Sequence, residues 1–286
     1  MLPPAAQTLL MKVRVAVVHL GALAVLWVPF HWSQVVLALC VFLAMQFGFE
    51  GICHRYFAHR AYKTSRLFQF ILAMWGSATG QKGMLWWADT HRQHHRHTDT
   101  PDDAHSPLHH GLWRAHVAWL WRPENMQAHP DRVKDLRKYP EIVWLDRYWD
   151  VFPPLVMATM FALGGVEWMV WGGLLPMALS LNATWMTNSV THFTDRRPVG
   201  RGGLRWRRFD TPDTTNNAPL LTIPLMGASW HNNHHRYPAA ARAGFYPGEL
   251  DPTYLVLRLW AALGLIWDLR EVPEAVLAEG LAPEAD

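Results

Sequence analysis

The sequence has little of what holds a small secreted protein together or marks a nucleic-acid-binding protein. Its 286 residues include two cysteines, Cys40 and Cys53, and both fall in one apolar stretch. Helical residues thirteen apart lie about 20 Å apart, which is beyond disulfide reach. The net charge of +3 is too diffuse to predict nucleic-acid binding. The first apolar run is followed by another apolar run rather than by a small-residue cleavage site and a soluble body, and no solenoid repeat is present, so an uncleaved, non-repetitive chain is expected.

Positive charge is missing from two long stretches. No Lys or Arg occurs in residues 15–54 or 151–195, although the chain contains 26 of them. Each stretch holds two apolar runs separated by a short turn, and each run has about the minimum length for crossing a bilayer. The sequence therefore predicts two helical hairpins with four transmembrane helices, at residues 15–30, 35–51, 151–163 and 168–188.

The same distribution predicts an orientation. By the positive-inside rule, the two uncharged turns face outward, and everything else, including both termini, faces the cytoplasm. Residues 52–150 and 189–286 then form a cytosolic helical cap, with an interfacial rather than spanning helix at Leu67–Ala78. The last apolar stretch, Leu255–Leu269, is expected to be interfacial or packed on the cap. Mean hydropathy near zero fits an anchor carrying a large polar cap. We expect one all-α membrane domain over residues 1–286, in a bacterial inner membrane.

Histidine is abundant and patterned. An HxxHH pattern occurs at residues 91–95 and again at 231–235, HxxxxH occurs at 54–59, and an Asn lies four residues before a His at 188–192. Helical residues three and four apart share a face, so each pattern can present several imidazoles to one point. Nine such histidines exceed the four ligands of a structural zinc and suit two neighbouring ions. The predicted topology places all nine on one side of the membrane. The nine are His54, His59, His91, His94, His95, His192, His231, His234 and His235.

The remaining single histidines carry no such pattern. We interpret them as ordinary surface residues or hydrogen-bonded core residues: His19, His31, His97, His109, His110, His116 and His129.

The motifs HRYFAHR, HRQHHRHTDTPDDAHSP, LNATWMTNSVTH and WHNNHHRYP resemble the histidine boxes of the membrane acyl-CoA desaturases of the stearoyl-CoA (delta-9) type. The resemblance runs from about residue 35 to 270 and includes the order and spacing of the boxes. It implies a four-helix membrane anchor under a cytosolic cap with a histidine-rich di-iron centre.

The resemblance also implies roles for individual residues. The nine histidines would hold two irons, and Asn188 would complete one shell through a water; which histidine serves which iron is not readable from the sequence. Gln81, Trp87, Thr184 and Trp185 would line the acyl channel or its mouth. Zinc fits the same nitrogens but cannot change redox state, so bound zinc would indicate a misloaded site.

Some residues near the boxes allow two interpretations. Asp99, Asp103 and His105 either support ligand imidazoles or lie on the surface. Glu50, one turn before His54, either hydrogen-bonds that histidine or extends to the membrane interface.

The activity implied by the resemblance is oxygen-dependent insertion of a cis double bond, at delta-9, into a saturated acyl-CoA. The two external electrons would come from a separate donor of ferredoxin, rubredoxin or cytochrome type. Acyl carrier protein or a membrane lipid could instead carry the acyl chain. Two alternatives stay open: a di-iron lipid hydroxylase, distinguished by product mass, and a membrane zinc hydrolase, which would leave most of the nine histidines unexplained.

Overall fold

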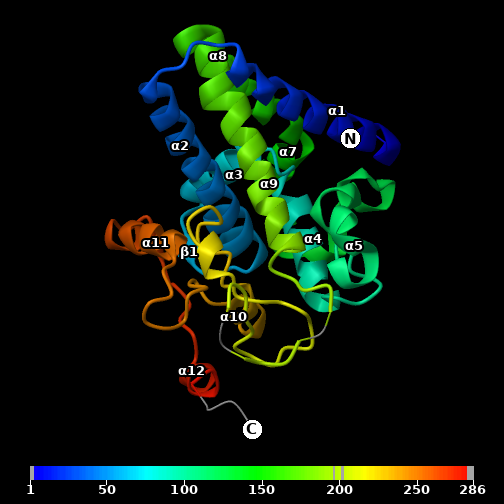
Figure 1. Cartoon of the computed structure of the whole chain (residues 1–286), viewed down its shortest axis with the longest axis vertical. Helices are drawn as coiled ribbons and strands as arrows, with labels where there is room; N and C mark the ends of the chain where they lie inside the picture. The colour runs from blue at the N-terminus through cyan, green and yellow to red at the C-terminus, as the bar shows by residue number, and fades with distance from the viewer. Residues whose placement is uncertain (1–2, 196, 201–202, 282–286) are drawn as a thin grey trace.

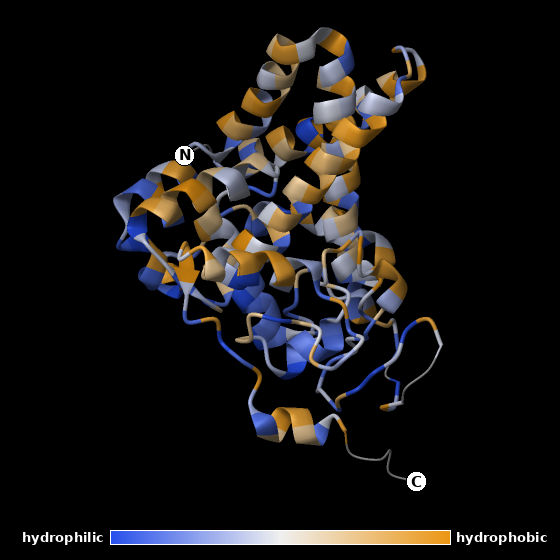
Figure 2. Ribbon diagram, turned by 90° about the vertical axis from the view of Figure 1, so that its left-hand side faces the viewer, coloured by the Kyte–Doolittle hydropathy of each residue, from blue (hydrophilic) through white to orange (hydrophobic). Residues whose placement is uncertain are grey.

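The computed structural model describes residues 3–195, 197–200 and 203–281. The protein is mostly helical, with three long apolar helical segments, Pro4–Leu26, Trp32–Ala58 and Trp149–Ser189, each long and apolar enough to cross a membrane. Figure 1 shows these helices together at one end of the molecule, with α10 and α12 at the other. In Figure 2 the upper helices are mostly hydrophobic and the lower part mostly hydrophilic. The long apolar helices and the mostly polar part of the chain thus lie at opposite ends of the molecule.

The first hairpin is longer than predicted. Helix α1 (Pro4–Ala22) begins at Pro4 rather than near residue 15, and η1 (Leu23–Leu26) extends it. The polar beginning is helical because it packs on the cap: Arg14 donates to the carbonyl of Asp150 and stacks over the Trp149 ring at 4.4 Å. After the turn, α2 (Trp32–Phe47) continues directly into the π-helix η2 (Gly48–Ala58). The second helix therefore runs past the predicted end at residue 51 and carries the first histidine motif.

The long segment Trp149–Ser189 folds back on itself. Helix α8 (Phe152–Met169) has non-helical backbone at Gly164 and Gly165, where φ of Gly165 is +66°, a conformation that favours glycine. Beyond it, η7 (Val170–Leu174) leads into α9 (Leu175–Ser189). The side chain of Met157 occupies the space beside Gly173. The helical segments before Gly164 and after Gly165 thus run antiparallel, and the chain reverses between the two helices predicted at residues 151–163 and 168–188.

The two hairpin turns meet. Gln34 accepts a hydrogen bond from the backbone N–H of His31 and donates one to Glu167 at 2.7 Å. Below the hairpins, the cap is built from short helices and 3₁₀ turns. They are α3 (Arg66–Ala78), α4 (Met84–His97), α5 (Pro107–His116), η3 (Ala118–Trp121), η4 (Pro123–Asn125), η5 (Pro130–Val133), α6 (Lys134–Arg137), α7 (Pro140–Arg147), η6 (Trp149–Val151), η8 (Pro219–Leu221), α10 (His231–Arg236), α11 (Pro252–Ala262) and α12 (Glu274–Glu279).

The prediction of an all-α fold is wrong in one detail. Strand β1 (Lys63–Thr64) pairs antiparallel with β2 (Ile266–Trp267), with Lys63 opposite Trp267. The stretch predicted as one apolar helix to residue 269 therefore ends as α11 at Ala262, followed by Gly264 with φ +71° and then the strand. This ladder ties the chain after the first histidine motif to the chain after the third.

Candidate metal centre

The structure brings all nine predicted histidines together. They come from η2 and the residue after it, from α4, from the chain after α9 and from α10, and they form two groups whose ligand nitrogens lie within 4.8 Å of one another. The first group is His54, His59, His91, His95 and His234. The second is His94, His192, His231 and His235. The seven histidines interpreted as ordinary lie outside both groups.

The spacing of the nitrogens fits a metal ion. Within the first group, the Nε2 atoms of His54 and His234 lie 2.9 Å apart, those of His59 and His91 2.8 Å, and those of His91 and His95 3.0 Å. In the second group, His192 and His231 bring their Nε2 atoms to 3.1 Å. Two nitrogens at right angles around a metal, each about 2.1 Å from it, lie about 3.0 Å apart. The donor set therefore fits two neighbouring ions.

The HxxxxH pair depends on the π-helix. In an α-helix, residues five apart differ by about 140° around the axis, so His54 and His59 would point to different sides. In η2 the backbone N–H of His59 instead donates to the carbonyl of His54 at 3.2 Å, five residues back. This wider turn brings the two imidazoles onto one face, with their ring centroids 4.8 Å apart.

Carboxylates form hydrogen bonds with the Nδ1 atoms of four of these imidazoles. Glu50 bonds Nδ1 of His54 at 2.7 Å, and Asp99 bonds Nδ1 of His192 at 3.1 Å. Asp103 bonds Nδ1 of His94 at 3.1 Å, and Asp213 bonds Nδ1 of His235 at 3.0 Å. Such contacts fix the tautomer and ring orientation of a metal ligand. The structure confirms that Glu50, Asp99 and Asp103 contact these imidazoles. All three side chains are buried, so the alternatives, a surface position for the two aspartates and extension to the membrane interface for Glu50, are wrong.

His105 supports the site indirectly. Its backbone N–H donates to Asp103, and its ring packs on His94 with centroids 4.4 Å apart. His94, Asp103 and His105 together form a third cluster of metal-ligand type. Sequence reasoning missed Asp213 because no helical spacing relates it to a histidine. The signal available was the run of short polar residues around it, TPDTTNN, which contains Thr and Asn but no Lys, Arg or Glu.

A buried ionic network anchors Glu50, which is fully buried. Its second oxygen accepts hydrogen bonds from Arg55 at 3.0 and 2.9 Å, and Arg55 also donates to both oxygens of Asp251. Asp251 in turn caps the start of α11 through the N–H of Tyr254. An unpaired buried carboxylate would be costly, so Arg55 and Asp251 keep Glu50 in place beside His54. Sequence reasoning did not single out either residue.

The electrostatics favour neutral imidazoles facing the metal positions. Burial, together with neighbouring histidines, holds the pKa values of His59, His91, His95, His231 and His234 well below 6.5. The pKa of His235 is about 4, because burial outweighs the attraction of Asp213. Burial opposes ionisation of the three aspartates, but their histidine partners and hydrogen bonds hold their pKa values well below the usual range. Neutral imidazole is the form that binds a metal.

This arrangement predicts a pH dependence for the metal-free protein. Histidines with folded pKa values below 6.5 bind fewer protons than they do in the unfolded chain, so stability is lost as the pH falls below about 6.5. Each can contribute up to about 1.4 kcal/mol per pH unit; His192, whose pKa Asp99 raises against burial, acts in the opposite direction. We expect the thermal midpoint of metal-stripped protein in detergent to decrease as the pH is lowered from 8 to 5.5. A pH-independent midpoint in the stripped protein would contradict this.

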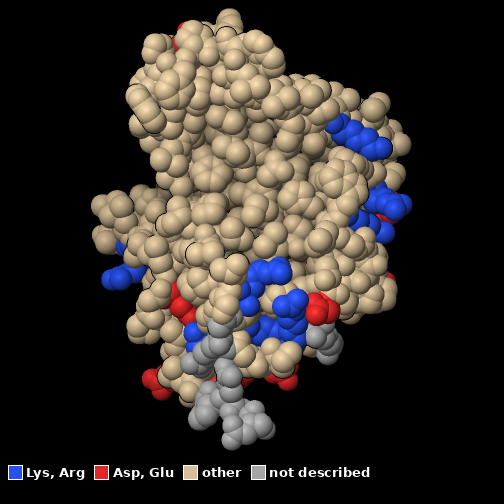
Figure 3. Space-filling model, viewed as in Figure 1, with Lys and Arg blue, Asp and Glu red and all other residues tan. Residues whose placement is uncertain are grey.

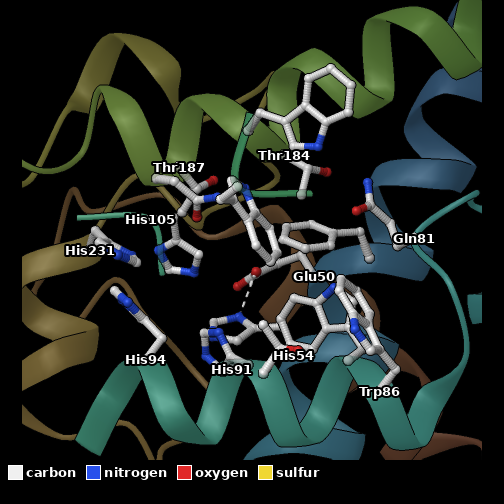
Figure 4. A pocket seen from close by; sticks show the side chains of 16 residues that line it. Glu50, His54, Gln81, Trp86, His91, His94, His105, Thr184, Thr187 and His231 are labelled. Carbon is white, nitrogen blue, oxygen red and sulfur yellow. Dashed lines mark hydrogen bonds and ion pairs between the residues drawn. The ribbon is translucent and has the colours of Figure 1, made fainter. Parts of the chain in front are cut away.

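A pocket adjoins both histidine groups (Figure 4). Helix α4 supplies one wall with His91 and His94, and α9 supplies the opposite wall with Thr184 and Thr187. The rest of the lining is largely aromatic: Phe49, Trp86, Trp87, Trp119 and Trp185. Gln81, Trp87, Thr184 and Trp185, the four residues predicted to contact an acyl chain, all line it, as does Asn188. The arrangement offers a mainly apolar space that reaches the metal-binding nitrogens.

Comparison with known proteins agrees with this site. The family model described as fatty acid desaturase matches residues 30–243. The chain is 33% identical to an sn-2 palmitoyl-lipid 9-desaturase of Nostoc sp. (strain 36), over 87% of this chain and 85% of that protein. It is 31% identical to a hex-5-enoyl-(acyl-carrier protein) acetylenase of Moorena producens (strain JHB), over 90% and 83% of the two chains. It is 32% identical to an acyl-CoA 5-desaturase of Anemone leveillei, over 86% and 74%. The chain belongs to the fatty acid desaturase family.

Proposed function

We propose that this chain is an oxygen-dependent delta-9 desaturase that introduces a cis double bond into a saturated acyl-CoA. The observation that carries the proposal is the aromatic pocket that reaches both histidine groups. The delta-9 position is supported by relatives that are named as 9-desaturases, such as the Nostoc protein. The protein would sit in a bacterial inner membrane as four transmembrane helices in two hairpins. Residues 52–150 and 189–286 would form the cytoplasmic cap of a single domain.

The two histidine groups would hold two irons. His54, His59, His91, His95 and His234 would bind one, and His94, His192, His231 and His235 the other. Asn188 lines the pocket together with His94 and His231, which supports a contact to the second iron through a water. The irons would supply the activation of dioxygen that removing two hydrogens from an unactivated carbon chain requires.

The chain's own residues would bind and orient the substrate. Trp86, Trp87 and Trp185 would pack on the methylene chain and exclude water from the reacting carbons. The side-chain nitrogen of Gln81 is buried without a hydrogen-bond partner in the described part of the chain, so it can donate to a polar group of the substrate. Glu50 and Asp99 would hold His54 and His192 in fixed orientations during turnover.

CoA is the acyl carrier in this proposal. Similar proteins are named for lipid, acyl carrier protein and CoA substrates. A smaller cavity shares Gln81, Trp86 and Trp185 with the aromatic pocket and is also lined by Arg14 and Lys82. Burial lowers the pKa of Lys82 to about 7. Lys82 is then only partly charged at neutral pH, and it is the guanidinium group of Arg14 that supports an anionic carrier such as CoA.

The proposal is tested by the fatty-acid profile of a host without endogenous desaturases. We expect cells expressing the chain to contain a monounsaturated species with its double bond at delta-9, and cells expressing His94→Ala to lack it. Mass spectrometry with double-bond localisation reports both. Purified enzyme given stearoyl-CoA, stearoyl-acyl carrier protein or stearoyl-lipid would then identify the carrier. A product that gains one oxygen atom would replace desaturation with hydroxylation, and zinc-supported activity without oxygen would indicate a hydrolase.

A further inference from the structure

One histidine of the second group, His192, lines an open surface groove. The groove has a volume of about 510 Å³ and is lined by His192, Phe193, Trp113, Arg197 and Arg205, among others. Phe193, next to His192 in the chain, is buried in its floor. The guanidinium groups of Arg197 and Arg205 stack over the Phe193 ring at 4.3 and 4.8 Å. The groove therefore joins basic side chains on the surface to a residue adjacent to a proposed iron ligand.

The groove also has an apolar wall that water reaches. Leu112 and Trp113 on α5 expose 54% and 65% of their surface. Exposed aromatic groups beside arginines are the combination enriched at the centres of protein interfaces. Arg205 donates to the carbonyl of Val190, while Arg197 forms an exposed ion pair with Asp195 at 3.2 Å. Both guanidinium groups are therefore held in place while remaining at the surface.

A second surface hollow reaches the histidines from another side, and its charge is opposite. That cleft touches His94 and His105 and is lined by Asp89, Asp102, Asp103 and Glu124, with Arg132. An acidic protein would be repelled there and attracted to the groove of Arg197 and Arg205. The two hollows thus differ in the partner that they can accept.

We propose that the groove is the docking site of a small, acidic, one-electron carrier protein. The proposal rests on the proposed function, because desaturation consumes electrons from outside the chain.

Dioxygen accepts four electrons as it becomes two waters: two come from the two C–H bonds that are broken, and two come from two reduced carriers. The two hydrogens leaving carbon and two solvent protons complete the waters. Each carrier leaves oxidised by one electron, so docking must be brief and repeated, as in the small interfaces of redox complexes.

The position of the groove favours a soluble protein over an anionic lipid. In Figure 3, Lys and Arg side chains gather over the loop that follows α9, while the upper part of this face, formed by the apolar helices, is almost free of charge. The basic patch thus lies toward the cap end of the molecule. A carrier bound there would lie above Phe193 and His192, and electrostatic steering would speed its arrival.

The test uses the full-length enzyme in detergent micelles with a reduced acidic ferredoxin as carrier. The double variant Arg197→Gln, Arg205→Gln is compared with a charge-matched double variant, Lys134→Gln, Arg258→Gln, whose side chains are exposed on α6 and α11. We expect the groove variant to raise the KM for ferredoxin by about tenfold at low salt, with kcat preserved and the difference vanishing at high salt. Product formation driven by a small-molecule reductant should equal that of the wild type.

The outcomes separate this proposal from the proposed function. If the small reductant yields no unsaturated product with the wild type, the proposed function fails. If the wild type is active and the groove variant keeps its KM for ferredoxin, or changes no more than the control variant, the docking site is overturned. An equal loss with the small reductant would show a structural defect and overturn it too. A difference that appears only in vesicles containing anionic lipid would assign the groove to lipid.

Discussion

Replacing His234 with alanine is expected to abolish desaturation, with a loss on the order of a thousandfold or more. The Nε2 of His234 lies 2.9 Å from that of His54 and 3.0 Å from that of His95, so its removal takes one donor from the middle of the first group. The iron content of the purified protein should fall, and the remaining iron should be held by the second group. The protein should stay in the membrane, because α10 is outside the long apolar segments.

The matched control is His129→Ala. His129 is exposed and lies outside both histidine groups, so activity and iron content should match the wild type. Activity is measured as monounsaturated product per enzyme, and iron by elemental analysis of the same preparation. Wild-type activity or unchanged iron in His234→Ala would refute its assignment as a ligand. A parallel His94→Ala variant, which removes a donor from the second group, should lose activity equally.

Replacing Asp99 with asparagine should lower activity by roughly 10- to 100-fold, the usual cost of removing a carboxylate that supports a metal-binding histidine. One oxygen of Asp99 accepts from Nδ1 of His192 at 3.1 Å and from the N–H and hydroxyl of Thr214 at 2.8 and 2.7 Å. The other accepts from Ser106 at 2.6 Å. Asparagine keeps one acceptor oxygen for His192 and Thr214 but carries no negative charge, so it holds the Nδ1–H of His192 more weakly. The loss should therefore appear as weaker iron binding by the second group, partly restored by added ferrous iron.

Asparagine is the replacement that disturbs the backbone least at this position. Asp99 has φ +55°, a conformation that Asn and Asp adopt more readily than other non-glycine residues. The exposed Asp102 provides the control, and Asp102→Asn should behave as the wild type. The hypothesis fails if both variants lose the same activity, or if Asp99→Asn retains full activity without added iron.

Much of the site follows from local spacing. The two HxxHH motifs predicted six of the nine histidines because residues three and four apart in α4 and α10 share a face. The gaps in Lys and Arg predicted where the chain would turn. Gly164 and Gly165 do reverse the chain, and His192 does join His94, although 98 residues separate them in the sequence. Patterns that depend on the local backbone and on charge along the chain were therefore enough to predict the nine histidines as a set, whereas their division into two groups comes from the structure.

What could not be predicted depends on tertiary contacts or on unusual backbone. The HxxxxH spacing would place His54 and His59 on different sides of an α-helix. Only the i→i+5 hydrogen bonding of η2 brings the two imidazoles onto one face. Asp213 reaches His235 across a loop, and Arg55 reaches Asp251 across most of the chain. The polar start of α1 is helical because Arg14 packs on Trp149. None of these pairings has a period or a spacing that a single sequence reveals.

The meeting of His54 with His234 has a consequence for the durability of the fold. The two residues are 180 positions apart, and an ion bound by both would join distant parts of the chain as a disulfide does. In the chain-entropy treatment, a crosslink closing a loop of that length is worth roughly 5 kcal/mol. Cys40 and Cys53 are both free thiols and supply no such bond. For this protein, chelation would then be the counterpart of reducing a secreted protein, releasing at once a constraint that spans most of its length.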